Sequence, residues 1–293
     1  MPTLLDELVR TLSADGNLSV RVLVATNLVR EAAHRHQTKP AATVALGRAL
    51  MGALLLASES SDAMRVQLAF RGQGPLGSII ASAEGRERVR GYVTHPGADV
   101  PLKGAHLGVA EAIGLGELAV ERIHPSWKRP YSGIVPLVTG EIAQDLAHYL
   151  FESEQKPSAV AAGIYLGPDA GVEAAGGYLI QALPGADEDS LARVEERISI
   201  HSNPSEQVRA GAGATELLEQ LLGPGEHGPI DRFEPRFACQ CNAERVTRAA
   251  TLLGEEEIRE IVSRNETLEV RCSWCGEVYM LSADELGRQS PDA

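Results

Sequence analysis

The four cysteines of this chain form two closely spaced pairs near the C-terminus. Cys239 and Cys241 make a C-x-C pattern, Cys272 and Cys275 make a C-x-x-C pattern, and 30 residues separate the two pairs. Zinc in structural sites is held by four tetrahedral ligands, and two short loops that each supply two thiolates provide them. Clustered cysteines in an intracellular chain indicate metal or redox chemistry, whereas disulfide frameworks belong to short secreted domains. The pattern therefore predicts one Zn²⁺ ion per chain, bound by all four cysteines in the reduced form.

The spacing of the first cysteine pair favours a redox role over a purely structural one. Zinc-binding loops usually have two to four residues between their ligands, so the C-x-C spacing holds Cys239 and Cys241 unusually close. Of two adjacent thiolates, one can react with peroxide and the other can resolve the product to a disulfide.

The residues around the cysteines can stabilise the thiolates. Gly276 can adopt a positive φ, which turns backbone N–H groups toward the sulfurs. Four thiolates on one zinc ion leave a local charge of about −2, which arginines close in the sequence can offset: Arg236, Arg245, Arg248 and Arg271.

The composition of the chain limits the classes of protein to which it can belong. It has 293 residues, 44% of them apolar, and a formal net charge of −13. This length suits one large domain and a smaller one, and the negative charge argues against nucleic acid as the main partner. The longest apolar run, residues 49–57, is shorter than the roughly 18 residues needed to cross a bilayer. We therefore expect a cytoplasmic protein that binds neither nucleic acid nor membrane.

Residues 1–184 mix helical and strand patterns in a way that favours an α+β core domain. Strands joined by short Gly-rich turns outnumber strand–helix–strand units, so we expect helices on one face of a sheet and not a doubly wound fold. The segment 72–77 matches G-x-G-x-x-G, but Pro75 and the β-rich residues that follow predict a hairpin turn instead of a dinucleotide site. The expected helices are 6–12, 27–36, 40–60 and 141–153, and the expected strands are 64–71, 78–83, 88–94, 118–123, 131–138, 159–166 and 177–183.

The composition changes at residues 185–230, which we interpret as a metastable helical linker. Acidic residues at 187–189 favour the start of a helix, and a second helix is expected from Pro204 through Gly211 and Gly213. Each glycine costs a helix about 1 kcal/mol relative to alanine, so alanine at both positions is expected to stabilise the linker. The apolar side chains expected to be buried against the core are Val208, Leu217, Leu218, Leu221 and Leu222.

Residues 231–293 are expected to form a small C-terminal zinc-binding domain. Helical patterns at 243–253 and 255–262 bring the two cysteine pairs together, and strand patterns at 267–271 and 278–281 place the second pair at the tip of a hairpin. The segment contains 8 arginines, no lysine and 13 acidic residues, a net charge of −5.

Two other classes of protein remain as alternatives. A zinc-ribbon nucleic-acid-binding regulatory protein is one, and the acidic C-terminal segment counts against it. A dithiol oxidoreductase is the other, and it requires Cys272 to lie at the start of a helix in a βαβ unit. The strand pattern on both sides of Cys272 does not fit that arrangement. We therefore expect that the chain is not an enzyme.

Five stretches of the chain closely resemble the heat shock protein 33 family, the 33 kDa chaperonins, and they occur in the same order as in that family. They include both cysteine patterns and the combination Ser-Glu-Gln-x-Pro, and they lie between residues 131 and 276. These stretches are 131–135, 153–157, 174–181, 237–241 and 272–276.

This resemblance implies a redox-regulated, ATP-independent holdase chaperone of the stress response. It implies that the reduced, zinc-bound form is inactive, and that oxidation forms the disulfides Cys239–Cys241 and Cys272–Cys275 and releases zinc. The C-terminal domain and the linker then unfold, the protein forms a homodimer, and it binds unfolded or partially folded client proteins. Thiol reductants later restore the cysteines, and clients pass to ATP-dependent foldase chaperones for refolding.

Overall fold

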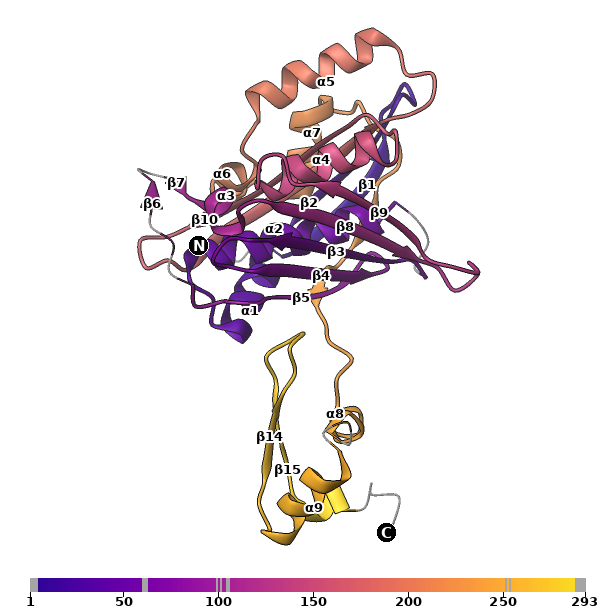
Figure 1. Cartoon of the computed structure of the whole chain (residues 1–293). Coiled ribbons are helices and arrows are strands. Elements are labelled where there is room, and N and C mark those ends of the chain that lie inside the picture. Colours follow the sequence, from indigo (N-terminus) through magenta and orange to yellow (C-terminus); the bar gives the residue numbers. More distant parts are fainter. Residues whose placement is uncertain are drawn as a thin grey trace. The chain divides into compact units, whose positions relative to one another are not determined.

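The long apolar helix α2 (Pro40–Ala57) lies at the centre of the larger of two compact units in this computed structural model (Figure 1). The structure describes residues 5–59, 63–98, 100, 102–103, 106–250, 252 and 254–287, and the units are Met1–Phe237 and Ala238–Ala293. Pro40 occupies the first turn, where its missing N–H costs nothing. Among the described helices α2 alone has the length and apolar composition of a membrane span, but 89% of it is buried inside the fold. It is therefore a core helix in this structure, as the sequence predicted.

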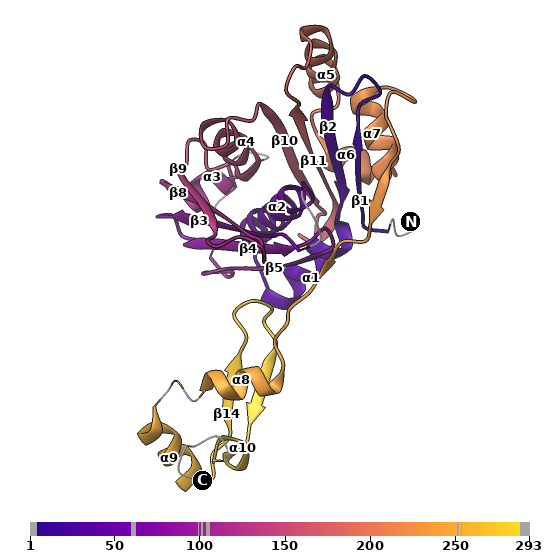
Figure 2. The same cartoon turned by 90° about the vertical axis from the view of Figure 1, so that its right-hand side faces the viewer.

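Two sheets enclose α2 in the first unit, one antiparallel throughout and the other with a single parallel pair of strands. Figure 2 shows α2 and α4 (Ile142–Glu152) between them, with α1 (Thr26–His36) beside α2. The first sheet has the order β10 (Ser158–Leu166), β11 (Val172–Ala182), β2 (Leu18–Val24), β1 (Glu7–Leu12) and β12 (Asp231–Phe233). The second has the order β13 (Arg236–Phe237), β5 (Arg88–Val93), β4 (Ser78–Glu84), β3 (Arg65–Gly72), β8 (Gly116–Ile123) and β9 (Tyr131–Pro136). The short elements β6 (Leu102–Lys103), β7 (His106–Leu107) and α3 (Val109–Ile113) connect β5 to β8.

Three helices cover the face of the first sheet that points away from α2. They are α5 (Glu188–Ile200), α6 (Pro204–Arg209) and α7 (Ala214–Leu222). Helix α6 packs on β10 and β11, α7 packs on β1 and β2, and α5 packs on α7. All three come from the segment that the sequence predicts to be a linker.

The second unit is small and is built around one hairpin. It contains α8 (Ala243–Ala250), α9 (Glu255–Ser263), β14 (Leu268–Arg271), β15 (Val278–Leu281) and α10 (Ala283–Gly287). Among its described residues, the buried apolar cluster consists of Val246, Ala250, Ile258, Leu281 and Leu286. Five side chains, of which one is alanine, give little apolar burial to stabilise a separate unit.

The α+β class, the hairpin turn at 72–77 and most predicted helices and strands are confirmed. Strands β3 and β4 pair directly across 72–77, and Gly77 has a φ of +65°. The expected single sheet with helices on one face is wrong in detail, because there are two sheets and α2 lies between them. Residues 231–237, expected with the C-terminal domain, form β12 and β13 on the two sheets of the first unit. The division into core, metastable linker and switch domain stays a prediction.

Two local predictions are wrong. Residues 6–12 were expected to be helical but form β1, where Leu8 pairs with both Leu23 and Phe233. Hydrogen bonding on both sides of a six-residue segment outweighs its weak helical spacing. The expected single helix from Pro204 is two helices, because Gly211 between them has a φ of +106°, which no helix can contain.

Candidate metal centre

The second cysteine pair lies in the tight turn that joins β14 to β15, as predicted. Cys272 follows β14 directly, and its backbone N–H donates a hydrogen bond of 2.8 Å to the carbonyl of Glu277. The N–H of Gly276 donates to the carbonyl of Cys272 at 2.8 Å, and Gly276 has a φ of +73°, the conformation expected from the sequence. The turn therefore fixes both sulfurs of the C-x-x-C pattern on the same side of the hairpin.

The first cysteine pair lies in the segment just before α8, and α8 holds that segment in place. Arg245 donates from Nη1 to the carbonyl of Gln240 at 2.9 Å, and its N–H donates to Asn242 Oδ1 at 2.8 Å. Gln240 is the residue between Cys239 and Cys241, so Arg245 orients the C-x-C loop from the next helix. Of the four arginines predicted to lie near the cysteines, Arg245 is therefore one that the structure does place beside a cysteine loop.

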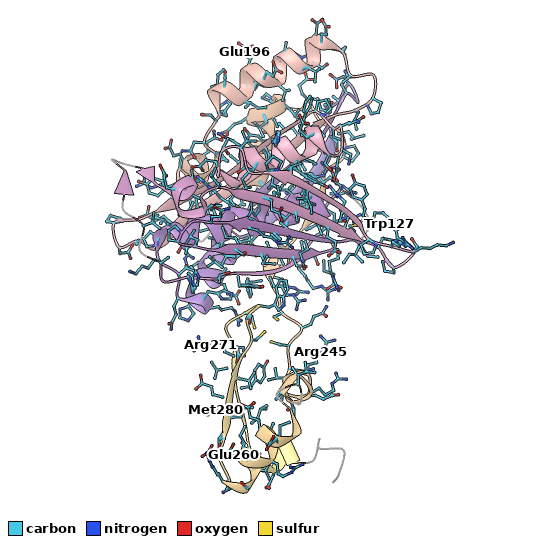
Figure 3. The ribbon with its side chains drawn as sticks, viewed as in Figure 1. Trp127, Glu196, Arg245, Glu260, Arg271 and Met280 are labelled. Atoms are coloured by element: carbon cyan, nitrogen blue, oxygen red, sulfur yellow. The ribbon has the colours of Figure 1, made fainter. Side chains whose placement is uncertain are left out.

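The other three predicted arginines are placed differently. Arg248 makes an exposed ion pair of 3.9 Å with Glu244, and Arg271 is exposed on β14 (Figure 3). Arg236 belongs to β13 in the first unit. Their role in offsetting thiolate charge therefore stays a prediction.

The four sulfurs form one cluster with the dimensions of a tetrahedral thiolate site. Cys239 Sγ lies 3.9 Å from Cys272 Sγ, Cys241 Sγ lies 3.4 Å from Cys275 Sγ, and all four sulfurs lie within 4.8 Å of one another. A zinc–sulfur bond of about 2.3 Å requires sulfur–sulfur edges of about 3.8 Å in a regular tetrahedron. None of the four cysteines forms a disulfide, and Cys275 is buried while the others are half-buried. The cluster therefore fits a metal ion with four sulfur ligands.

Hydrogen bonds to three of the sulfurs support this interpretation. The backbone N–H of Trp274 donates to Cys272, and that of Glu277 donates to Cys275. Tyr279 on β15 donates from its hydroxyl to Cys241 Sγ at 3.2 Å. Donors around a metal site orient the ligands and stabilise their charge. The donors here come from the hairpin, and no pattern in the sequence singled out Tyr279.

The protonation of the cluster explains why a cation belongs in it. Burial raises the pKa of Cys272 and raises the pKa of Cys275 much further, and the nearby sulfurs add to the rise in the pKa of Cys275. Without a positive charge the thiols of Cys272 and Cys275 therefore stay protonated at neutral pH, whereas a thiolate is the form that binds metal. The donor set is thus suited to a thiophilic dication such as zinc.

The predicted linker covers an apolar face of the first sheet. The expectation that its apolar side chains are buried is confirmed: Val208, Leu217, Leu218 and Leu221 are at most 3% exposed, and Leu222 is partly buried against the same cluster. They pack on the side chains of the strands beneath, including Val20, Val22 and Tyr178.

A group of hydrogen bonds attaches the start of α5 to the turn between β1 and β2. Ser190 Oγ donates to Asp15 Oδ2 at 2.6 Å, and Asn17 Nδ2 donates to Asp187 Oδ2 at 2.6 Å. Asp187 also accepts the Ser190 N–H at 2.8 Å and so caps the helix. Hydrogen bonds from Ser13 and Ser190 lower the pKa of Asp15, and the Ser190 N–H lowers the pKa of Asp187.

A buried ionic network in the first unit was not anticipated from the sequence. Arg122 binds Glu59 at 2.8 Å and Glu154 at 2.8 Å, and all three side chains are less than 10% exposed. Tyr149 donates to Glu154 at 3.1 Å, and Lys156 binds it at 2.9 Å. The Ser-Glu-Gln-x-Pro stretch therefore has a structural function, and its partner Arg122 is too distant in the sequence for a local pattern to reveal the pair.

Known proteins resemble this chain along nearly its whole length. A family model described as Hsp33 protein matches residues 6–282. The 33 kDa chaperonin of Geobacter sulfurreducens is 42% identical over 287 residues, which cover 97% of this chain and 94% of the relative. A 33 kDa chaperonin of Thermus thermophilus is 41% identical over 290 residues, which cover 95% of this chain and 85% of the relative. The crystal structure of the 33 kDa chaperonin from Thermotoga maritima superposes with a TM-score of 0.88 at 33% identity and covers 97% of each chain. The chain therefore belongs to the Hsp33 family and is a chaperone.

Proposed function

We propose that this chaperone is a holdase switched on by oxidation of its four cysteines. In the reduced cytoplasmic form, Cys239, Cys241, Cys272 and Cys275 bind one zinc ion and the protein is inactive. Oxidation joins Cys239 to Cys241 and Cys272 to Cys275 and releases the metal. The second unit and the linker then unfold, and the protein dimerises and binds unfolding clients without ATP. Thiol reductants reverse the oxidation, and clients pass to ATP-dependent foldases.

The observation that carries this proposal is the sulfur cluster in a unit with a very small core. The cysteines come from two loops, and their sulfurs lie within 4.8 Å of one another, while the described core of the unit is a cluster of five buried apolar residues. Zinc bound to four thiolates would contribute about 10–16 kcal/mol of apparent binding free energy, which is as large as the total stability of a typical domain, about 5–15 kcal/mol.

Disulfides between sequence neighbours do not replace that link. Each would close a loop of a few residues, and the chain-entropy relation assigns such loops roughly 2 kcal/mol. Neither would connect the C-x-C loop to the C-x-x-C turn. Oxidation with this pairing therefore removes the strong link between the two loops on which a core of this size depends.

The apolar surface for clients comes from the linker and the sheet beneath it. Helix α6 has six residues and α7 has nine, and isolated helices shorter than roughly 12–15 residues are not stable in water. They depend on packing against the first sheet, where Val20, Val22 and Tyr178 lie. Release of the linker exposes both faces of this interface at once.

The proposal is tested by the aggregation of a heat-unfolded client, followed by light scattering. The reduced, zinc-loaded chain is expected to leave aggregation unchanged, and the peroxide-treated chain is expected to suppress it at a roughly stoichiometric ratio. Addition of a thiol reductant to the oxidised chain is the reversal control. Equal suppression by the reduced and oxidised forms would show that the cysteines do not control activity.

A further inference from the structure

Tyr279 is a side chain that contacts a sulfur of the cluster from outside the cysteine loops. It lies on β15, where its backbone pairs with Val270 of β14, and its ring is partly buried against the core of the second unit. The next residue on the strand, Met280, is 60% exposed (Figure 3), so Tyr279 points to the inner side of the hairpin, as strand alternation requires. Packing therefore fixes the ring, and with it the hydroxyl 3.2 Å from Cys241 Sγ.

This hydrogen bond differs in kind from those to the C-x-x-C sulfurs. Cys272 and Cys275 receive backbone N–H groups from Trp274 and Glu277, which belong to the turn and are present whatever side chains occupy it. Cys241 receives a side-chain hydroxyl from a residue 38 positions away. The contact therefore joins the C-x-C loop to the hairpin independently of the metal.

We propose that Tyr279 is a positioning residue that sets how readily the cysteine centre is oxidised, because its hydroxyl holds Cys241 in the cluster and stabilises the charge on its sulfur. This inference rests on the proposed redox function. A hydrogen bond to a thiolate lowers its nucleophilicity and strengthens its retention as a ligand. The bond must weaken before the sulfur can react or leave the metal.

The step that Tyr279 opposes is the reaction of the C-x-C pair with hydrogen peroxide. A thiolate attacks one peroxide oxygen, the O–O bond breaks, and a sulfenic acid forms while the departing hydroxide takes a proton to become water. The neighbouring thiol then attacks the sulfenic sulfur, the S–S bond forms, and a second water leaves. One peroxide thus accepts two electrons from Cys239 and Cys241, and both of their sulfurs must leave the cluster.

The test is the full-length Tyr279→Phe variant, which removes the hydroxyl and keeps the ring. Reduced, zinc-loaded protein is treated with a fixed concentration of peroxide, and a coloured chelator reports zinc release. In the same samples, free thiols are trapped by alkylation and the peptides are mapped by mass spectrometry. The mapping reports how much Cys241 remains free and how much Cys239–Cys241 disulfide has formed. Loss of one outer hydrogen bond at a metal site typically weakens metal retention roughly 10–100-fold. We expect faster zinc release and faster loss of free Cys241 in the variant, each by about tenfold or more.

Thr247→Val is the matched control, since Thr247 is buried in the same unit and its hydroxyl donates to the carbonyl of Ala243 at 2.8 Å, away from the sulfurs. Valine keeps the shape and removes the hydroxyl. Rates for Tyr279→Phe within twofold of the unaltered chain would overturn the proposal, as would an equal acceleration by Thr247→Val. Loss of free Cys241 is read without reference to zinc or chaperone activity. If the unaltered chain is not activated by oxidation, the proposed function is refuted. The rate of Cys241 loss in Tyr279→Phe can still be compared with that in the unaltered chain, so the effect of the hydroxyl is tested separately.

Discussion

The sequence context of Gly211, between α6 and α7, suggests that alanine would stabilise the linker. The backbone conformation of Gly211 predicts instead that alanine destabilises it. Its φ of +106° lies in a region that L-residues rarely adopt. A Cβ at this position would meet no atom within 4 Å, so the cost of alanine is confined to the backbone, about 1–3 kcal/mol. A factor of ten corresponds to about 1.4 kcal/mol. Gly211→Ala should therefore raise the population of undocked linker roughly 5- to 150-fold.

Hydrogen exchange and client aggregation measure this effect. In reduced Gly211→Ala, backbone amides of residues 204–222 should exchange faster, and less peroxide or heat should be needed for chaperone activity. Gly213→Ala is the matched control in the same segment. Gly213 is the N-cap of α7 with a φ of −82°, and a Cβ there would meet only the exposed Glu216 carboxylate, at 2.8 Å, so alanine adds no backbone strain and loses only the capping preference for glycine, about 1 kcal/mol or less. Slower exchange in Gly211→Ala than in the unaltered chain would refute this reasoning.

Three further predictions concern the metal, the attachment of α5 and the buried ionic network. Cys239→Ser or Cys272→Ser should each retain zinc much more weakly in metal analysis of the reduced protein, because the tetrahedron loses a thiolate; retention equal to that of the unaltered chain would exclude a four-cysteine site. Because the folded-state pKa values of Asp15 and Asp187 are lowered, their contribution is complete above the ordinary carboxyl range, about pH 4, and is lost as the pH falls through the folded values. The thermal midpoint should thus fall less between pH 7 and pH 3 in Asp15→Asn than in the unaltered chain, and an identical decrease would contradict the assignment. Arg122→Leu leaves two buried carboxylates with the half-exposed Lys156 as their remaining ion-pair partner and should cost about 3–5 kcal/mol in urea unfolding, whereas Arg71→Leu, from an exposed pair with Glu117, should cost at most about 1 kcal/mol.

The clustering of the four cysteines was predictable because they are rare residues with a characteristic spacing. Two short loops with fixed separations leave few arrangements of four sulfurs, and the structure brings together the same four residues that the sequence pointed to. Helices α1, α2 and α4 were predictable for a related reason: each has continuous helical spacing over at least 11 residues.

The features that escaped prediction depend on contacts between distant residues. Strand β1 has only six residues, and β2 and β12 determine its conformation through pairing. Arg122 and Glu59 are 63 positions apart, and Tyr279 and Cys241 are 38 apart. No local pattern encodes such pairs. Gly211 was misjudged because composition does not distinguish a glycine inside a helix from one that ends it.

Strands β12 and β13 have a consequence for the order in which the chain comes apart. In the sequence they lie between α7 and the second unit, and each is hydrogen-bonded to a different sheet, β12 to β1 and β13 to β5. Two ion pairs of 2.7 Å, Arg10–Asp231 and Arg232–Glu7, add to the attachment of β12. Unfolding that begins at residue 238 and proceeds toward the N-terminus must therefore detach two strands before it reaches the linker helices. In the proposed switch, oxidation and linker release are thus separate events, and the segment 231–237 between them acts as a threshold that heat can help the chain to cross.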